Sequence, residues 1–500
     1  MSLIRRRTGK RFVAVLAVVL AVGGCTRGAD SAQAVAPAAH AFGTHLQKRI
    51  TVEAMMGHLH KLQDIANANG NTRAIGTPGY QASVEYVSKA LRDKGFDVQT
   101  PEFKVRQFDA EPGTVNAGPD AFKATGLMYS MGTPPDGVSG PLVAAPAGDD
   151  SPGCTASDYD GLPVQGAVVL VDRGECEFAE KLKVAVSRGA AALIVADNTE
   201  EKDFGGNLGS STEVKIPVVG VTKADGSALR GRTGPVTVKL TVNDREVPVR
   251  SVIAQTKTGS TADVVMTGAH LDSVEQGPGI NDNGSGTAAV LETALQLGPS
   301  PQVRNAVRFA FWGAEESGLV GSDRYIESLN VDELRDIALY LNFDMLGSPN
   351  PGYFTYDGDQ STKLPRDERV PRVPEGSAAI ERLLVAYLHS AGKTAEDTGF
   401  DGRSDYDAFT LAGIPSGGLF AGAEENMNDE QAKLWNGRAG APFDPNYHKA
   451  TDTIEHIDQT ALAIQGAGVG YAVGFYATDI TGRTGMPPRD ERTRHTVEPK

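Results

Sequence analysis

Acidic and histidine side chains follow three consecutive predicted strands, at the points where those strands end. The apolar runs and the residues after them are 263–268 with His270 and Asp272, 307–311 with Glu315 and Glu316, and 338–341 with Asp344. Because ligands of open α/β sheets bind beyond the carboxyl ends of the strands, we expect these side chains to meet at one edge of a sheet.

The side chains in this set are of the types that bind zinc, with manganese or cobalt as substitutes. Carboxylate ligands would balance most of the charge of two such ions. A carboxylate shared by both can hold them about 3.5–4 Å apart and let them activate one water. A neighbouring acid that is not a ligand can take the proton from that water. Glu315 and Glu316 could take these two roles, one as the base and one as a metal ligand, since successive residues aim their side chains differently. The residues alone predict a metal-assisted hydrolase, without a substrate.

The elements that would position these residues form a layered pattern. From Ser251 onward, predicted strands alternate with predicted helices, which is typical of an α/β sheet with helices on both faces. The expected helices here are 285–297, 318–329, 378–391 and 459–479, and a further strand is expected at 414–420. Two helices, 51–69 and 80–94, precede this region, and Gly95 ends the second.

A different composition marks residues 128–247. Glycine, proline and short valine-rich runs predict a compact β-rich unit with one helix at 178–188. The runs 166–174 and 189–198, with the helix between them, resemble the protease-associated (PA) domain. No nucleophile, base or metal cluster stands out in this unit, so we assign it no chemistry.

Four motifs, in order, resemble the M28 family of zinc aminopeptidases. They are Gly268-Ala-His-Leu-Asp-Ser273, Asn281-Asp-Asn-Gly-Ser-Gly286, Trp312-Gly-Ala-Glu-Glu-Ser-Gly318 and Asn342-Phe-Asp-Met345. The resemblance covers about 251–480 and the helices before the PA-like unit. It implies a mixed-sheet zinc-peptidase domain that carries a PA insert and removes N-terminal residues from peptides with a free N-terminus.

The resemblance also implies a role for each site residue. One zinc ion would be bound by His270 and Asp344, and the other by Glu316 and His448. Asp282 would bridge the ions, before a cis peptide bond to Asn283. Glu315 would be the general base, and Asp272 would orient the His270 ring.

The segment 444–453 matches the family's final ligand segment. Within it, Tyr447 would donate a hydrogen bond to the oxyanion of the tetrahedral intermediate. Some relatives have a cysteine where this chain has Asn446, so a disulfide is absent there. The segment 402–409 resembles the family's substrate-pocket loop and places Arg403 and Asp405 as candidate substrate contacts.

The first 25 residues have the features of an export signal. Arginines and a lysine precede a short apolar core at 12–22, which is too short to span a membrane. The small residues before Cys25 resemble a bacterial lipobox, in which Cys25 is lipidated. We therefore expect a protein held at the outer face of the cell membrane, with release into the medium as an alternative. An ordinary cleaved signal is the other interpretation.

Cys154 and Cys176 are the remaining cysteines. In an oxidising compartment such a pair is most simply a disulfide, and two free buried thiols are the alternative.

The net charge is −15, without a basic stripe, which excludes a typical nucleic-acid-binding protein. We expect a monomer.

The expected organisation begins with the signal peptide at 1–25 and a tether at 26–45. The peptidase domain follows in two parts, 46–127 and 248–482, separated by the PA-like insert at 128–247, and 483–500 forms a loose tail.

A dipeptidase or carboxypeptidase with the same metal site remains an alternative function, since Arg403 and Arg324 could bind a free carboxylate. So does a glutaminyl cyclase with one zinc, although the full ligand set argues against it. A non-catalytic surface lipoprotein is the alternative from another class.

Overall fold

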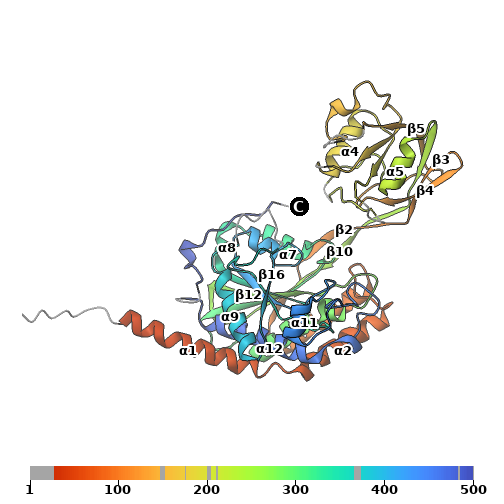
Figure 1. Cartoon of the computed structure of the whole chain (residues 1–500). Helices are drawn as coiled ribbons and strands as arrows, with labels where there is room; N and C mark the ends of the chain where they lie inside the picture. The colour runs from red at the N-terminus through yellow and green to blue at the C-terminus, as the bar shows by residue number, and fades with distance from the viewer. Residues whose placement is uncertain are drawn as a thin grey trace, which may run out of the picture.

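The computed structural model describes residues 27–146, 152–174, 176–199, 204–209, 212–364, 373–481 and 485–498. The predicted signal peptide and Cys25 lie outside the described residues. A larger α/β domain and a smaller β-barrel are joined by a two-stranded ribbon (Figure 1). The predicted fold class is confirmed.

An eight-stranded mixed sheet forms the centre of the larger domain, in the order β1-β11-β13-β12-β14-β17-β15-β16. Its strands are β1 (Asp97–Gln99), β11 (Val252–Gln255), β12 (Ser260–His270), β13 (Asn305–Trp312), β14 (Ile337–Asp344), β15 (Phe354–Tyr356), β16 (Glu396–Thr398) and β17 (Ser416–Phe420). β12 runs parallel to β13 and β14, and β14 runs parallel to β17. Every residue of β14 is buried, as expected for a parallel strand covered on both faces. The carboxyl ends of these strands therefore share one edge.

Helices cover both faces of this sheet. One face packs against α2 (Val52–Ala68), α3 (Pro78–Lys94), α6 (Gly286–Leu297), α9 (Ser377–Ser390) and α12 (Gln459–Thr478). The other packs against α7 (Val320–Glu327), α8 (Val331–Asp336) and α10 (Asp407–Leu411). Side chains of the strands alternate between the two cores: Phe309 and Leu341 belong to the first, and Trp312 and Tyr340 to the second.

The two helices before the barrel begin and end at the residues that the sequence indicates. The Thr51 side chain accepts a hydrogen bond from the backbone N–H of Ala54 at the start of α2. Thr77 does the same for Tyr80 at the start of α3, which ends at Gly95 with a φ of 101°. A φ of that sign favours glycine, so Gly95 ends the helix and turns the chain toward β1.

The smaller domain is a closed barrel in the order β3-β4-β8-β7-β6-β5-β9. Its elements are β3 (Gly113–Ala117), β4 (Asp120–Gly126), β5 (Val138–Ala144), η1 (Ala156–Tyr159), β6 (Val168–Asp172), α4 (Phe178–Ser187), β7 (Ala192–Ala196), β8 (Val218–Val221), α5 (Lys223–Arg230) and β9 (Pro235–Lys239). The barrel thus includes two strands that precede the predicted boundary at residue 128. Cys154 and Cys176 form a disulfide within it.

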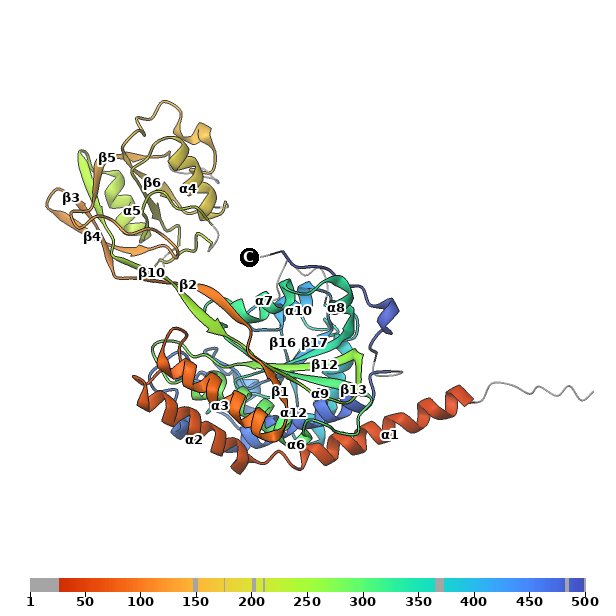
Figure 2. The ribbon, with the colours of Figure 1, turned by 180° about the vertical axis from the view of Figure 1, so that it is seen from behind.

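A ribbon of two antiparallel strands connects the barrel to the α/β domain (Figures 1 and 2). β2 (Glu102–Ala110) pairs with β10 (Val242–Arg250) along its whole length. Arg106 forms an ion pair with Asp244 across the ribbon at 2.6 Å. The insert therefore leaves and re-enters the larger domain at a single place.

The N-terminal part of the described chain differs from the predicted tether. Residues Arg27–Gln47 form helix α1, whose first part extends beyond the domain in Figure 2. Alanine-rich sequence favours helix, and the prediction gave this too little weight. The second part of α1 packs on α12, where a β-carbon on Gly474 would lie 2.9 Å from the Cα of Gly43. In the described part of the chain, no helix is both long and apolar enough to span a membrane.

The C-terminal segment also differs from the predicted loose tail. It contains η5 (Arg489–Glu491) and a buried arginine, Arg492. The Arg492 guanidinium donates to the carbonyls of Ala262 (3.0 Å) and Arg335 (2.7 Å) and to the carboxylate of Asp263 (2.6 Å). These acceptors lie near the amino ends of β12 and β14, so the segment fixes the sheet on the edge opposite the strand ends that carry the site residues. A polar composition did not reveal these contacts because they depend on residues far away in sequence.

We predict that Arg492→Met lowers the free energy of unfolding by about 2–4 kcal/mol, since it removes the hydrogen bonds of a buried guanidinium. Turnover of the folded enzyme should not change, because the contacts lie away from the site. Thermal and denaturant unfolding would measure the loss. Arg489→Met, which removes a half-exposed ion pair with Asp336 on the same segment, is the matched control and should have a smaller effect. Equal losses for the two variants would contradict a special role for Arg492.

Candidate metal centre

The fold brings together side chains from five separate segments. His270 and Asp344 are the last residues of β12 and β14, and Glu315 and Glu316 lie in the loop after β13. Asp282 lies in the turn η2 (Ile280–Ser285), at the start of α6. His448 lies between α11 (Asp429–Trp435) and η3 (Ile454–His456). We call residues 279–285 the Asp282 turn and residues 444–453 the His448 loop.

The first potential metal-binding group contains His270, Asp282 and Asp344, whose ligand-type atoms lie within 4.8 Å of one another. His270 Nε2 is 3.2 Å from Asp282 Oδ1. It is also 3.4 Å from Asp344 Oδ1. All three residues are buried.

The second group contains Asp282, Glu316 and His448, again within 4.8 Å. His448 Nε2 lies 3.2 Å from Asp282 Oδ2 and 3.1 Å from Glu316 Oε2. Asp282 therefore presents one oxygen to each histidine. The peptide bond from Asp282 to Asn283 is cis, as predicted.

Several buried atoms of these groups have no hydrogen-bond partner among the residues that the structure describes. They are His270 Nε2, Glu316 Oε1 and Asp344 Oδ1. A buried polar atom without a partner costs free energy, and each of these three belongs to a residue of the two groups described above. The residues present therefore fit a zinc site.

Electrostatics favours cations here as well. Burial and the neighbouring Asp282 raise the pKa of Glu316 to about 7. Burial also raises the pKa of Glu315 well above its ordinary value, and nearby Glu316 and Asp344 raise it further. Carboxylates held so close together and away from water need positive charge nearby to stay ionised.

Glu315 and Asp272 lie beside the two groups without belonging to either. Glu315 Oε2 is 3.8 Å from His270 Nε2. The Asp272 carboxylate accepts hydrogen bonds from the backbone N–H groups of Glu315 (3.2 Å) and Glu316 (3.3 Å). His270 Nδ1 lies 3.2 Å from the backbone oxygen of Asp272 and 3.8 Å from its carboxylate. Asp272 thus contacts the histidine mainly through its backbone and both glutamates through its side chain.

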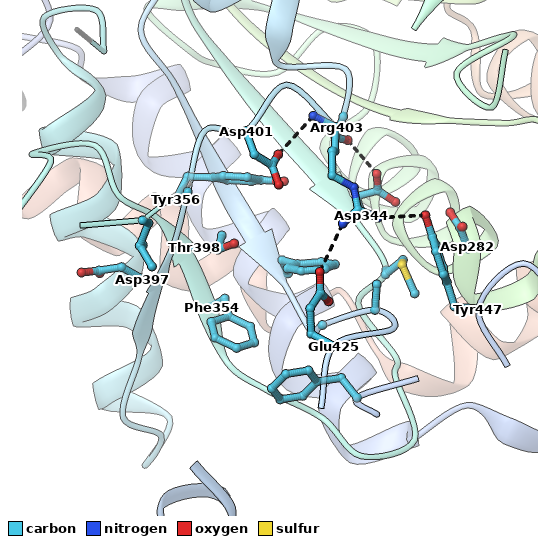
Figure 3. Close-up of a pocket in the computed structure, with 18 of the residues that line it drawn as sticks. Asp282, Asp344, Phe354, Tyr356, Asp397, Thr398, Asp401, Arg403, Glu425 and Tyr447 are labelled. Carbon is cyan, nitrogen blue, oxygen red and sulfur yellow. Dashed lines mark hydrogen bonds and ion pairs between the residues drawn. The ribbon is translucent and has the colours of Figure 1, made fainter. Parts of the chain in front are cut away.

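A pocket of about 400 Å³ opens beside the metal-type residues (Figure 3). Its apolar wall consists of Met345, Phe354, Tyr356, Phe420 and Phe443. Several carboxylates also line it, among them Asp397, Asp401 and Glu425.

Arg403 and Tyr447 lie together at this pocket, as Figure 3 shows. Arg403 Nη2 donates to Tyr447 Oη at 3.4 Å and to Glu424 at 2.8 Å, and Nη1 donates to Glu425 at 3.2 Å. The Tyr447 ring stacks on His448, with centroids 3.8 Å apart. The structure therefore brings both predicted residues to the site.

Asp405 is placed differently from its prediction as a substrate contact. It is 1% exposed and does not line the pocket, whereas its neighbours Arg403, Ser404 and Tyr406 do. Burial raises its pKa to about 8. A short helix, α10, follows at Asp407–Leu411.

Three buried residues near the site were missed in the sequence. Arg73 donates to the backbone carbonyls of Pro278, Leu271 and Gly279. Asp444 and Asp452 bind the Asp282 turn from the His448 loop. The sequence offered a signal for each: Arg73 begins a Gly/Pro-marked loop, and both aspartates lie within the predicted final ligand segment.

Comparison with known proteins agrees with this geometry. Residues 251–473 match the model of peptidase family M28, and residues 138–229 match the PA domain. A probable lipoprotein aminopeptidase, LpqL, of Mycobacterium tuberculosis is 66% identical over 97% of this chain and 98% of its own length. An aminopeptidase of Pseudomonas aeruginosa is 40% identical over 86% of this chain and 82% of its own.

Solved structures show the same architecture. The aminopeptidase from Aneurinibacillus sp. strain AM-1 superposes with a TM-score of 0.68 at 26% identity, covering 89% of this chain and 98% of that one. A zinc aminopeptidase from Bacillus subtilis superposes with a TM-score of 0.61 at 26% identity, covering 87% and 98%. The chain therefore belongs to peptidase family M28 and falls among the aminopeptidases of that family.

Proposed function

We propose that this protein removes single N-terminal residues from peptides, using two zinc ions. His270 and Asp344 would bind one ion, Glu316 and His448 the other, and Asp282 both. The observation that supports this most directly is the placement of Asp282, whose two oxygens each lie 3.2 Å from a different histidine.

Bound zinc would polarise the scissile carbonyl and make a water acidic enough to attack it. Glu315, beside the groups rather than within them, would take the proton from that water and pass it to the leaving amine. Tyr447 would donate a hydrogen bond from its hydroxyl group to the carbonyl oxygen, which gains negative charge during the attack. The Tyr447 hydroxyl is free to donate in this way, because in its contact with Arg403 it is the acceptor.

The charges at the pocket favour a substrate amine over a substrate carboxylate. A carboxypeptidase would need a cation available for the free carboxylate. Arg403 is engaged by Glu424 and Glu425, and Arg324 by Glu327 at 2.8 Å. The carboxylates of Asp397 and Asp401, which line the pocket and are not proposed metal ligands, suit an ammonium group instead.

The same proposal includes the cellular setting. We propose that Cys25 carries a lipid that holds the exported protein at the membrane surface, as the relative named as a lipoprotein suggests. Its partners would be peptides with a free N-terminus, with no nucleic acid, and the enzyme would act as a monomer.

Aminoacyl-arylamides test the activity. The purified protein should release arylamine from unblocked substrates, should lose this activity to a chelator, and should regain it with added zinc. Hydrolysis of N-acetylated but not free substrates would overturn the assignment. Mass spectrometry of peptide products would show which end is shortened. Release of residues from the carboxyl end would support the carboxypeptidase alternative instead.

The apolar wall of the pocket leads to a prediction about the N-terminal residue. Burial of a leucine side chain contributes about 1.5–3 kcal/mol, so kcat/KM for leucyl-arylamide should exceed that for glycyl-arylamide by about 10- to 100-fold. Acidic N-terminal residues should be poor substrates, because several carboxylates line the pocket. A panel of arylamides at fixed zinc would measure the order, and a preference for aspartyl-arylamide would contradict it.

A further inference from the structure

His448 differs from the other metal-type residues in how it is supported. His270 and Asp344 end buried strands, whereas His448 lies in a loop and its side chain is 39% exposed. Its backbone also has a positive φ of 55°, an uncommon conformation for a residue other than glycine, although histidine adopts it more often than most. Other contacts must therefore fix this loop.

Asp452 provides the first of these contacts. Its buried carboxylate accepts hydrogen bonds from the backbone N–H groups of Asn281 (2.8 Å, to Oδ1) and Asp282 (3.0 Å, to Oδ2). Its backbone carbonyl accepts a third from Ile280 at 3.2 Å. One residue of the His448 loop therefore binds three successive N–H groups of the Asp282 turn.

Asp444, at the other end of the loop, binds the same turn. Its Oδ2 accepts a hydrogen bond from Asn281 Nδ2 at 2.7 Å, and its Oδ1 accepts one from the backbone N–H of Asn446 at 2.8 Å. Asp444 is 2% exposed. The two aspartates lie on either side of His448 in the sequence, and both attach its loop to residues 280–282.

The opposite side of the Asp282 turn is held by the end of β14. Asn281 Oδ1 accepts from the backbone N–H of Gly347 at 3.0 Å, and Asn283 Nδ2 donates to the carbonyl of Phe343 at 3.0 Å. The turn is therefore fixed relative to Asp344, and the His448 loop is fixed to the turn.

We propose that Asp444 and Asp452 are positioning residues that hold His448 at the distance from Asp282 needed to bind the second cation. This rests on the two-ion function proposed above. The first position depends less on the loop, because His270 and Asp344 lie at strand ends and only Asp282 contacts the loop. Loss of either aspartate should therefore weaken zinc binding at the second position much more than at the first.

Zinc binding to the full-length protein tests this directly. After chelation and titration with zinc alone, wild type should bind two equivalents, and His448→Ala should bind one with high affinity. Asp452→Asn should resemble His448→Ala, with the weaker equivalent losing affinity by about 10- to 100-fold and the tighter one changing much less. Asp444→Asn should shift the same equivalent in the same direction.

Two comparisons separate positioning from a general loss of stability. Glu455→Gln changes an exposed acid three residues from Asp452 and should bind two equivalents like wild type. Unfolding of the chelated Asp452→Asn protein shows whether it is folded, and its activity should recover at high free zinc with KM close to that of wild type.

The possible failures are distinguishable. If Asp452→Asn and Asp444→Asn bind both equivalents as tightly as wild type, the positioning role is wrong and the two-ion function stands. If wild type itself binds only one equivalent, the two-ion function is wrong. If both equivalents weaken equally in the variants, the aspartates support the site as a whole and the selective role is overturned.

Discussion

A Glu315→Gln variant is expected to bind as much zinc as wild type and to lose turnover by about 10²–10⁴-fold, the range typical of a general base. The substitution keeps the size of the side chain and removes its capacity to accept a proton. Glu315 belongs to neither potential metal-binding group, so no ligand is changed. The loss should appear in kcat, since the pocket that binds the substrate side chain is unaltered.

The neighbouring glutamate provides the informative comparison. Glu316 Oε2 lies 3.1 Å from His448 Nε2 within the second group. Glu316→Gln should therefore lose zinc as well as turnover, although the change is chemically identical. Two adjacent residues would then separate proton transfer from metal binding.

Metal content and steady-state kinetics of both variants, at matched free zinc, would check this. Glu491→Gln, at an exposed position in η5, serves as a control for the substitution itself and should be fully active. Turnover of Glu315→Gln within a few fold of wild type would exclude Glu315 as the base. Zinc loss in that variant would instead make it a ligand.

The strands and their end residues were predictable because burial and chemistry agree there. β12, β13 and β14 contain long buried apolar runs, and an acid or histidine directly after such a run has few structural explanations. His448 does not follow a predicted strand, and only the resemblance to the family's final ligand segment identified it. These features are local in sequence, so a single chain reveals them.

What could not be predicted depends on contacts between distant residues. Arg492 is polar and near the C-terminus, yet it is buried against Ala262 and Arg335. Asp405 lies beside a pocket residue in sequence, but the fold buries it. Asp452 resembles any loop aspartate until the fold brings it against Asp282. In each case the partner is set by tertiary packing, which composition and periodicity do not encode.

Removal of zinc is expected to abolish turnover and to lower the unfolding temperature. In the folded protein, the carboxylates of Asp282, Glu316 and Asp344 are held close together away from water, and zinc would offset their repulsion. A ligand that binds only the folded state at 1,000 times its Kd stabilises it by about 4 kcal/mol. The chelated protein should regain both activity and stability on titration with zinc, and with little benefit from magnesium, which binds His-containing sites poorly.

The stability effect has its own controls, which do not depend on catalysis. Glu315→Gln should retain the zinc-dependent rise in unfolding temperature, because it keeps every proposed ligand. Asp282→Asn should lose most of the rise, since Asp282 is common to both groups. Calorimetry with and without chelator would measure this for each protein. An unfolding temperature that is independent of zinc in wild type would mean that the buried acids are compensated by protonation rather than by metal, and the proposed centre would then be wrong even if the fold is right.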